Sequence, residues 1–272
     1  MVMNMMPLIL YKLFSIYKFV NSFYKVLNIF TYICINNMKK KILVFTGAGV
    51  SAESGVETFR DTNGLWYNHK IEDVATPDGW RKDKSIVLEF YNQRRKQLKT
   101  VNPNKAHEII AQLEDHFDVT VVTQNVDNLH ERAGSTNVIH LHGELTKVRS
   151  TLNPKLIYDW EDDLNIGDKC ENGSQLRPHI VWFGEMLSFS DTEKSYTAAE
   201  EADVCIVVGT SMQVSPANKI PFLTREDALI YYVDPSDIDF FIDKQRKPFF
   251  EHVKSGAGDG MGKVKNDLIN LL

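Results

Sequence analysis

The stretch that decides the fold is residues 41–61, which read KILVFTGAGVSAESGVETFRD. Its apolar run from Ile42 to Phe45 is typical of a strand that is buried on both faces of a parallel sheet. Gly47 and Gly49 allow a tight turn and close approach of the backbone to a ligand, and the residues after them begin like a helix. Because N–H groups at the start of a helix attract a diphosphate, the stretch fits a dinucleotide site, although a ligand-free turn explains the glycines equally well.

Further strand-like runs are followed by polar turns along the chain. They are residues 119–123, 138–141, 204–208 and 229–233. Helical spacing of apolar residues over 82–100 and 106–113 alternates with these runs, which favours a parallel sheet covered by helices. We therefore predict an α/β fold with a doubly wound, Rossmann-like parallel sheet and a smaller inserted lobe.

Length and composition limit the number of domains, the kinds of partner and the compartment. The 272 residues suit one large domain, and the net charge of −5 gives no general attraction to nucleic acid. The three cysteines are widely spaced, and Cys205 lies in an apolar run where a reduced thiol is expected. These features indicate a reducing compartment, the cytoplasm.

Residues 1–37 differ in composition from the rest of the chain. They contain no Asp, Glu, Gly or Ala, and Lys12, Lys18 and Lys25 interrupt their apolar part. The lysines argue against a membrane-spanning helix of ~20 apolar residues. We interpret the segment as an extension upstream of a native start at Met38, because the first strand follows at once. A membrane-surface anchor or an uncleaved signal segment is the alternative.

Polar side chains gather where the predicted strands end. Gln124, Asn125 and Asp127 follow one strand, and His142 follows the next. Open parallel sheets bind their ligands at the carboxyl ends of the strands. Each of these residues alone is better explained as a hydrogen-bonded strand end, but together they predict a site.

Five segments, in this order, closely resemble the signature segments of sirtuins, the NAD-dependent protein lysine deacylases. They are GAGVSAESGVETFRD (47–61), TQNVDNLHERAG (123–134), HLHGEL (140–145), RPHIVWFGE (177–185) and VVGTS (207–211). The resemblance extends over most of residues 39–272. A dehydrogenase would explain only the first segment, and the acidic residue that it needs after a second strand is missing.

The resemblance implies an NAD site. Its residues would be Gly47, Ala48, Gly49, Ser51, Glu53, Thr58, Phe59, Arg60, Trp66, Gln124, Asn125, Val126, Asp127, Gly209, Thr210, Ser211, Asp234 and Ala257. An amide and a carboxylate suit the nicotinamide and its ribose, and Arg60 adds a cation beside the diphosphate. Asp234 stands where sirtuins commonly have Asn; a carboxylate there would repel a 2′-phosphate, so NAD is favoured over NADP.

The resemblance also implies the catalytic groups His142, Asn125 and Asp127. The acyl oxygen of the substrate would attack C1′ of the nicotinamide ribose, nicotinamide would leave, and His142 would accept a proton from a ribose hydroxyl. An imidazole with an ordinary pKa of ~6.5 is largely neutral near pH 7 and suits this role. His140, two residues earlier, is expected inside the strand rather than at its end.

Two segments indicate the protein substrate. Val181, Trp182 and Phe183 resemble the sirtuin strand that pairs with an acyl-lysine peptide; an ordinary core strand is the alternative. Tyr91 and Arg94 share a helix face and resemble the Tyr-x-x-Arg pair of sirtuins that remove succinyl and malonyl groups. A guanidinium fork suits a terminal carboxylate. The alternative is a solvated, charged helix face that includes Arg95 and Lys96.

The sequence departs from most sirtuins in lacking two Cys-x-x-Cys pairs. Only Cys170 lies between His142 and the Phe-Gly-Glu segment, so we predict no structural zinc. An apolar cluster is expected to stabilise the small lobe instead, formed by Leu152, Leu156, Ile157, Tyr158, Trp160 and Leu164.

The sequence thus predicts a catalytic domain over 38–272, with a small lobe from about 68–100 and 145–178. The expected function is transfer of an acyl group from protein lysine to ADP-ribose with release of nicotinamide, a transferase reaction. Succinyl and malonyl groups are expected substrates, together with acetyl. A mono-ADP-ribosyltransferase and a non-catalytic sensor of NAD or ADP-ribose are the alternatives. Protein lysines are the expected partners, and a membrane only if residues 1–37 are native.

Overall fold

The computed structural model describes residues 39–56, 65–66, 69–237 and 250–271, without the side chains of 65 and 66. Residues 40–272 form one compact unit and are described here by themselves. The predicted extension over 1–37 lies outside the described residues. None of the helices in the described ranges has the length and apolar composition needed to cross a bilayer.

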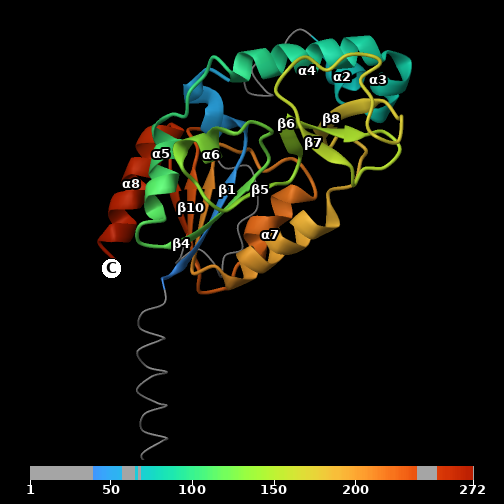
Figure 1. The fold of residues 1–272 in the computed structure, drawn as a ribbon. Helices are drawn as coiled ribbons and strands as arrows, with labels where there is room; N and C mark the ends of the chain where they lie inside the picture. The colour runs from blue at the N-terminus through green and yellow to red at the C-terminus, as the bar shows by residue number, and fades with distance from the viewer. Residues whose placement is uncertain (1–38, 57–64, 67–68, 238–249, 272) are drawn as a thin grey trace, which may run out of the picture. The chain divides into compact units, whose positions relative to one another are not determined.

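The main sheet has six parallel strands in the order β11-β10-β9-β1-β4-β5 (Figure 1). The strands are β1 (Lys41–Thr46), β4 (Asp118–Thr123), β5 (Val138–His140), β9 (Val204–Val208), β10 (Leu229–Val233) and β11 (Phe250–Val253). All five residues of β9 are buried, as expected for a strand covered on both faces. The predicted parallel, Rossmann-like fold is confirmed, while β11 is an addition that its sequence FEHV did not reveal.

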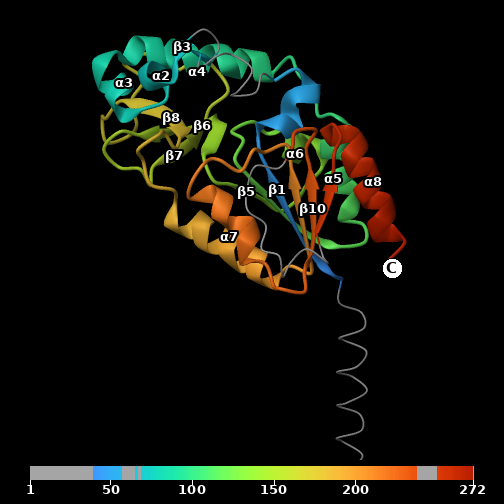
Figure 2. The same ribbon diagram turned by 180° about the vertical axis from the view of Figure 1, so that it is seen from behind.

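Helices cover both faces of this sheet. α5 (Lys105–Leu113) and α8 (Ala257–Ile269) lie together on one face, while α7 (Phe189–Glu201) and the 3₁₀ helix η2 (Ala217–Leu223) pack on the other (Figures 1 and 2). Alternate residues of β1 supply both interiors, since Ile42 and Val44 face α5 and α8 whereas Leu43 and Phe45 face α7. The short helix α6 (Leu129–Ala133) follows β4.

The turn after β1 leads into the 3₁₀ helix η1 (Ala48–Ser54). The expected helix start is therefore a short 3₁₀ segment and not an α-helix. Gly55 ends it in the left-handed conformation, at φ 86°. Beyond it, only the pairing of β2 (Leu65–Trp66) with β3 (His69–Lys70) is described before α2.

A second group of elements encloses its own apolar cluster. It comprises α2 (Ile71–Val74), α3 (Pro77–Lys82), α4 (Lys84–Leu98) and an antiparallel sheet of β6 (Gly143–Ser150), β7 (Ile157–Asp159) and β8 (Leu176–Ile180). The predicted helix over 82–100 corresponds to α4. None of the predicted strand-like runs falls in the stretch 145–178, although it contains most of this sheet. Its alternation was obscured because the register shifts between Glu144 and Val148.

The predicted apolar cluster of this region is only partly correct. Leu164 is fully buried, and Leu156, Tyr158 and Trp160 pack at the edge of the apolar cluster. Leu152 is 78% exposed and Ile157 is 43% exposed, so these two residues are not part of the core. Ile157 lies on the outer strand β7, where its side chain points away from the cluster.

Candidate active site

The candidate site lies where three neighbouring strands end. β1 pairs with β4 on one side and with β9 on the other, so the turns after these strands meet. Nε2 of Gln124 donates to Oγ1 of Thr210 over 3.1 Å and joins the turn after β4 to the turn after β9. The expected gathering of polar groups at the carboxyl edge of the sheet is confirmed by these positions.

Backbone contact between two turns explains the glycines after β1. The N–H of Gly49 donates to the carbonyl of Gly209 over 2.8 Å, and the N–H of Gly47 donates to Val208. A Cβ on Gly47 would lie 2.6 Å from Cβ of Thr210, and one on Gly209 would lie 2.2 Å from the nitrogen of Val50. Packing between the turns therefore requires these glycines, and the N–H groups of Gly47 and Gly49 donate within the chain.

Three buried polar side chains form the centre of the site. Oγ of Ser51 donates to Oδ2 of Asp127 over 3.0 Å and accepts from Nδ2 of Asn125 over 3.0 Å. The N–H of Leu129 donates to Oδ1 of Asp127. Burial raises the pKa of Asp127, although the hydrogen bonds from Leu129 and Ser51 and the charges of His140 and Arg94 oppose the rise. Ser51 thus forms one polar cluster with Asn125 and Asp127, which lie 74 and 76 positions later in the chain.

Two histidines that are not among the predicted site residues lie behind this cluster. His107 in α5 and His130 in α6 are fully buried, with ring centroids 4.8 Å apart. Nε2 of His107 lies 3.5 Å from Oγ of Ser51, and Nε2 of His130 lies 3.2 Å from Oγ1 of Thr46. Burial lowers the pKa of His107 to about 4 and that of His130 well below its ordinary value, so both are neutral. The capping box that His107 forms with Asn104 is the one local signal that pointed to it.

The rings of His142 and His140 contact the backbone carbonyls of two successive residues, Gln124 and Asn125. Nδ1 of His142 lies 2.9 Å from the oxygen of Gln124, and Nδ1 of His140 lies 3.1 Å from the oxygen of Asn125. Burial lowers the pKa of His142, although its bond to the carbonyl opposes the shift. His140 is the last residue of β5, not an interior one, and its Nε2 pairs with Glu131 over 2.7 Å.

Tyr91 and Arg94 are buried on α4, at 0% and 7% exposure. Arg95 is also buried, with its Nε donating to the carbonyl of Leu145. This burial contradicts the solvated helix face as an explanation of the two arginines. Lys96 alone fits that explanation, because it is exposed and pairs with Asp163 over 2.8 Å.

The expected substrate strand is a turn beyond the end of β8. The N–H groups of Val181, Trp182 and Phe183 donate to His142, Glu185 and Ala75 respectively. Strand-like pairing with a peptide through these three N–H groups is therefore not available. Trp182 is 2% exposed and belongs to the core, whereas Phe183 is 46% exposed.

The remaining predicted residues lie around this centre. Oε1 of Glu53 accepts from the N–H of Gly258 over 3.0 Å, which connects η1 to the first turn of α8. Ala257 is the first residue of this helix, and Gly260 lets the helix approach Val233, since a Cβ there would lie 2.3 Å from Cγ1. Asp234 follows β10 and accepts from Ser236. Ala48, Val126 and Ser211 are partly buried. Thr58, Phe59 and Arg60 lie outside the described residues, as does the side chain of Trp66.

Metal-binding geometry is not found in the described ranges. No group of three or more His, Cys, Asp or Glu side chains there lies close enough to hold a metal ion. Sγ of Cys170 instead lies 2.7 Å from Oδ1 of Asn172 and 3.0 Å from Oγ of Ser174.

Comparison with known proteins identifies the family. Residues 47–216 match the model of the Sir2 family. A protein from Helicobacter pylori named NAD-dependent protein deacylase is 53% identical over 196 residues, which cover 72% of this chain and 85% of the relative. One of the same name from Bacteroides thetaiotaomicron is 46% identical over 236 residues, or 85% and 98% of the two chains.

Solved structures agree with this assignment. The crystal structure of a Sir2 homologue in complex with NAD is similar with a TM-score of 0.75 at 38% identity, covering 86% of this chain and 91% of the other. The protein belongs to the Sir2 family.

Proposed function

We propose that this member of the Sir2 family is an NAD-dependent protein lysine deacylase that prefers acyl groups ending in a carboxylate, such as succinyl and malonyl. The relatives' shared name, NAD-dependent protein deacylase, supports the general activity. The burial of Tyr91 and Arg94 one turn apart on α4 carries the finer preference.

The polar cluster at the carboxyl edge of the sheet fits a nicotinamide nucleotide. Ser51, Asn125 and Asp127 present an amide, a hydroxyl and a carboxylate, which pair with carboxamide and ribose hydroxyl groups. The glycines of two adjoining turns leave no Cβ atoms between the backbones. NAD supplies the ADP-ribosyl group that receives the acyl group. Asn125 and Asp127 orient the nucleotide, and the residues 58–60 contribute to its diphosphate half.

His142 is the general base in this proposal. A carbonyl oxygen can only accept, so the bond to Gln124 places the ring proton on Nδ1. Nε2 then carries the lone pair and takes up a proton during acyl transfer. Because burial lowers the pKa of His142, the imidazole is neutral at pH 7.

Tyr91 and Arg94 form the proposed acid pocket. A guanidinium binds a carboxylate through two parallel hydrogen bonds, and these are stronger in a buried site than in water. Arg94 lies close enough to Tyr91 and Asp127 for its charge to oppose the rise that burial produces in the pKa of both. This proximity supports an acid pocket that adjoins the proposed nucleotide site.

The test compares NAD-dependent removal of succinyl and acetyl from one lysine peptide by the full chain and its Arg94→Met variant. We expect faster desuccinylation in the parent, and at least a tenfold selective loss of it in the variant, as a charge-assisted pair predicts. Equal rates on both peptides, unchanged by the substitution, would contradict the acid pocket. Labelled ADP-ribose retained on the protein would instead indicate a mono-ADP-ribosyltransferase.

We also propose a cytoplasmic location, because the three cysteines are widely spaced in the sequence, as in chains that keep their thiols reduced. Fractionation of cells that express the chain with and without residues 1–37 tests this. Membrane association of the longer form alone would assign an anchoring role to those residues.

A further inference from the structure

Trp182 is fixed by contacts on several sides. Its backbone N–H donates to Oε2 of Glu185 over 2.9 Å. Cζ of Arg177 lies 3.3 Å from the centre of its indole ring. The ring of Trp80 lies 5.7 Å away on the apolar side. The stacked guanidinium of Arg177 holds the Trp182 ring in one orientation.

Glu185 holds this arrangement together. Its two oxygens pair with Arg177 over 2.6 Å and with Arg149 over 3.0 Å. The three side chains are only 10–20% exposed, so solvent screens them little. Burial favours the protonated acid, but the bonds from Arg177 and Trp182 outweigh it and lower the pKa of Glu185, which is therefore ionised.

The fixed indole reaches the proposed acid pocket. Nε1 of Trp182 lies 3.0 Å from the phenol oxygen of Tyr91. An indole N–H can only donate, so the phenol oxygen accepts this bond and its own proton points elsewhere. Burial raises the pKa of Tyr91 to about 12, so the phenol keeps that proton at neutral pH.

We propose that Trp182 is a positioning residue for acyl specificity, which directs the proton of Tyr91 toward the terminal carboxylate of the acyl group by occupying the acceptor side of its oxygen. This role differs from the one expected from the sequence, pairing with an acyl-lysine peptide. The inference rests on the proposed preference for acidic acyl groups.

Trp182→Phe tests the inference because it removes the N–H donor and keeps an aromatic ring. We expect KM for a succinyl peptide to rise about tenfold with kcat changed less than twofold, since a hydrogen bond to a charged group loses its alignment. The ratio of kcat/KM for succinyl over acetyl falls accordingly. In the Tyr91→Phe background, Trp182→Phe is expected to cause no further fall in this ratio, because the group through which it acts is gone.

Trp80→Phe is the matched control, since it shortens the neighbouring indole without a bond to Tyr91. We expect it to leave the succinyl-to-acetyl ratio within twofold of the parent, and thermal melting checks that every variant is folded. Losses from Trp182→Phe and Tyr91→Phe that multiply in the double variant would overturn the inference, as would an equal loss for both peptides. A fall in the ratio for Tyr91→Phe with none for Trp182→Phe would overturn it and leave the proposed function intact. No effect of Arg94→Met or Tyr91→Phe would overturn the proposed function itself.

Discussion

Nδ1 of His142 donates to the backbone oxygen of Gln124, 18 residues earlier in the chain, over 2.9 Å. The bond fixes the tautomer, and burial lowers the pKa of the imidazole. The acid limb of the pH profile of kcat/KM is therefore expected below pH 6.5, the ordinary value for histidine. Steady-state rates between pH 5 and 9 measure this limb. His142→Gln should lose about 10²- to 10⁴-fold in kcat and lack the limb; a limb above 6.5 would contradict the assignment of His142 as the base.

The pair of His140 and Glu131 gives a second pH dependence. Burial lowers the pKa of His140, but Glu131 outweighs it and the net pKa is raised above 6.5. The pair's contribution to stability is thus fully present below the pKa of His140 in the unfolded chain. It is lost as pH rises through the pKa of His140 in the folded chain. Because Glu131 is 40% exposed, Glu131→Gln should cost only about 0.5–1 kcal/mol of unfolding free energy at pH 6, and less at pH 9. Urea unfolding at both pH values measures the difference, and an equal cost at each would refute the pair's protonation.

The buried His107 is expected to weaken the fold in acid. Its folded pKa is about 4 against 6.5 for the free group, so the unfolded chain binds the proton first as pH falls. As pH falls between those two values, His107 should lower the free energy of unfolding by up to about 1.4 kcal/mol per pH unit. His107→Gln, which retains a donor for Ser51, should reduce the slope of stability against pH. An unchanged slope in urea titrations from pH 7 to 5 would show that folding does not lower the pKa of His107.

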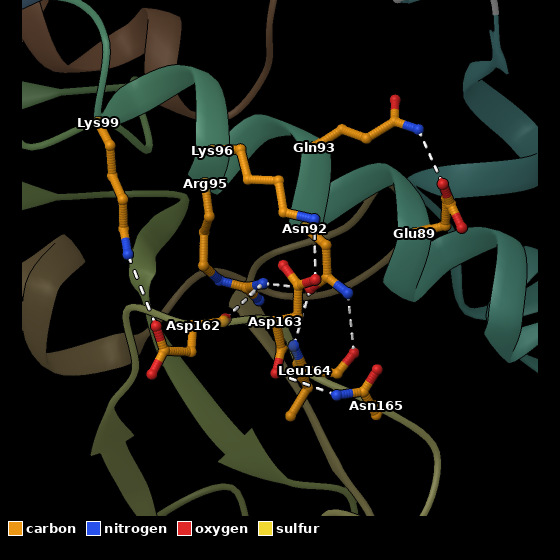
Figure 3. A network of polar contacts seen from close by, with 10 residues as sticks. All are labelled: Glu89, Asn92, Gln93, Arg95, Lys96, Lys99, Asp162, Asp163, Leu164 and Asn165. Atoms are coloured by element: carbon orange, nitrogen blue, oxygen red, sulfur yellow. Dashed lines mark hydrogen bonds and ion pairs between the residues drawn. The ribbon is translucent and has the colours of Figure 1, made fainter.

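A polar network ties α4 to the loop before β8 (Figure 3). Asn92 donates to the carbonyl of Leu164 and accepts from its N–H, over 3.1 and 2.9 Å, and Arg95 bonds to Asn92 and Leu145. Asn92→Ala should cost about 2–4 kcal/mol of unfolding free energy because it leaves buried groups unsatisfied. Lys96→Ala is the matched control: its ion pair with Asp163 is exposed, and its loss should cost less than about 1 kcal/mol. Equal melting temperatures for the two variants would exclude this role for Asn92.

Because the sequence lacks the two Cys-x-x-Cys pairs, we predict that chelators change neither the stability nor the activity of the protein. We expect EDTA to leave both the melting temperature and the deacylase rate unchanged, because the apolar cluster and the Asn92 bonds hold the small sheet. A zinc-dependent relative with two Cys-x-x-Cys pairs serves as the positive control. A fall in melting temperature on chelation, reversed by zinc, would reveal a metal site.

Apolar runs made the main sheet predictable. β1, β4, β9 and β10 are mostly buried, so their sequences are rich in apolar residues such as Val and Ile. The helices α4 and α5 were found from spacing alone. β11 was missed because its four residues include Glu and His, and the small sheet was missed because its strands alternate irregularly around a register shift.

The site was predictable only where residues follow strands. Gln124, Asn125 and Asp127 could be placed because the strand before them ends in a recognisable way. The contact of Ser51 with His107 joins residues 56 positions apart, and no local pattern encodes such a contact. The same holds for Arg95, whose neighbours in sequence are polar, but whose guanidinium is buried against β6.

Tyr91 and Arg94 alternate along α4 with Asn92 and Arg95, which fasten the helix to the small sheet. The residues of the proposed acid pocket and the residues that anchor the helix therefore share the segment 91–95. A library that varies the whole segment 91–95 in search of new acyl groups would return mostly unfolded chains. Diversifying positions 91 and 94 while keeping Asn92 and Arg95 separates the two demands, so the helix can acquire a new acyl preference with its anchorage intact.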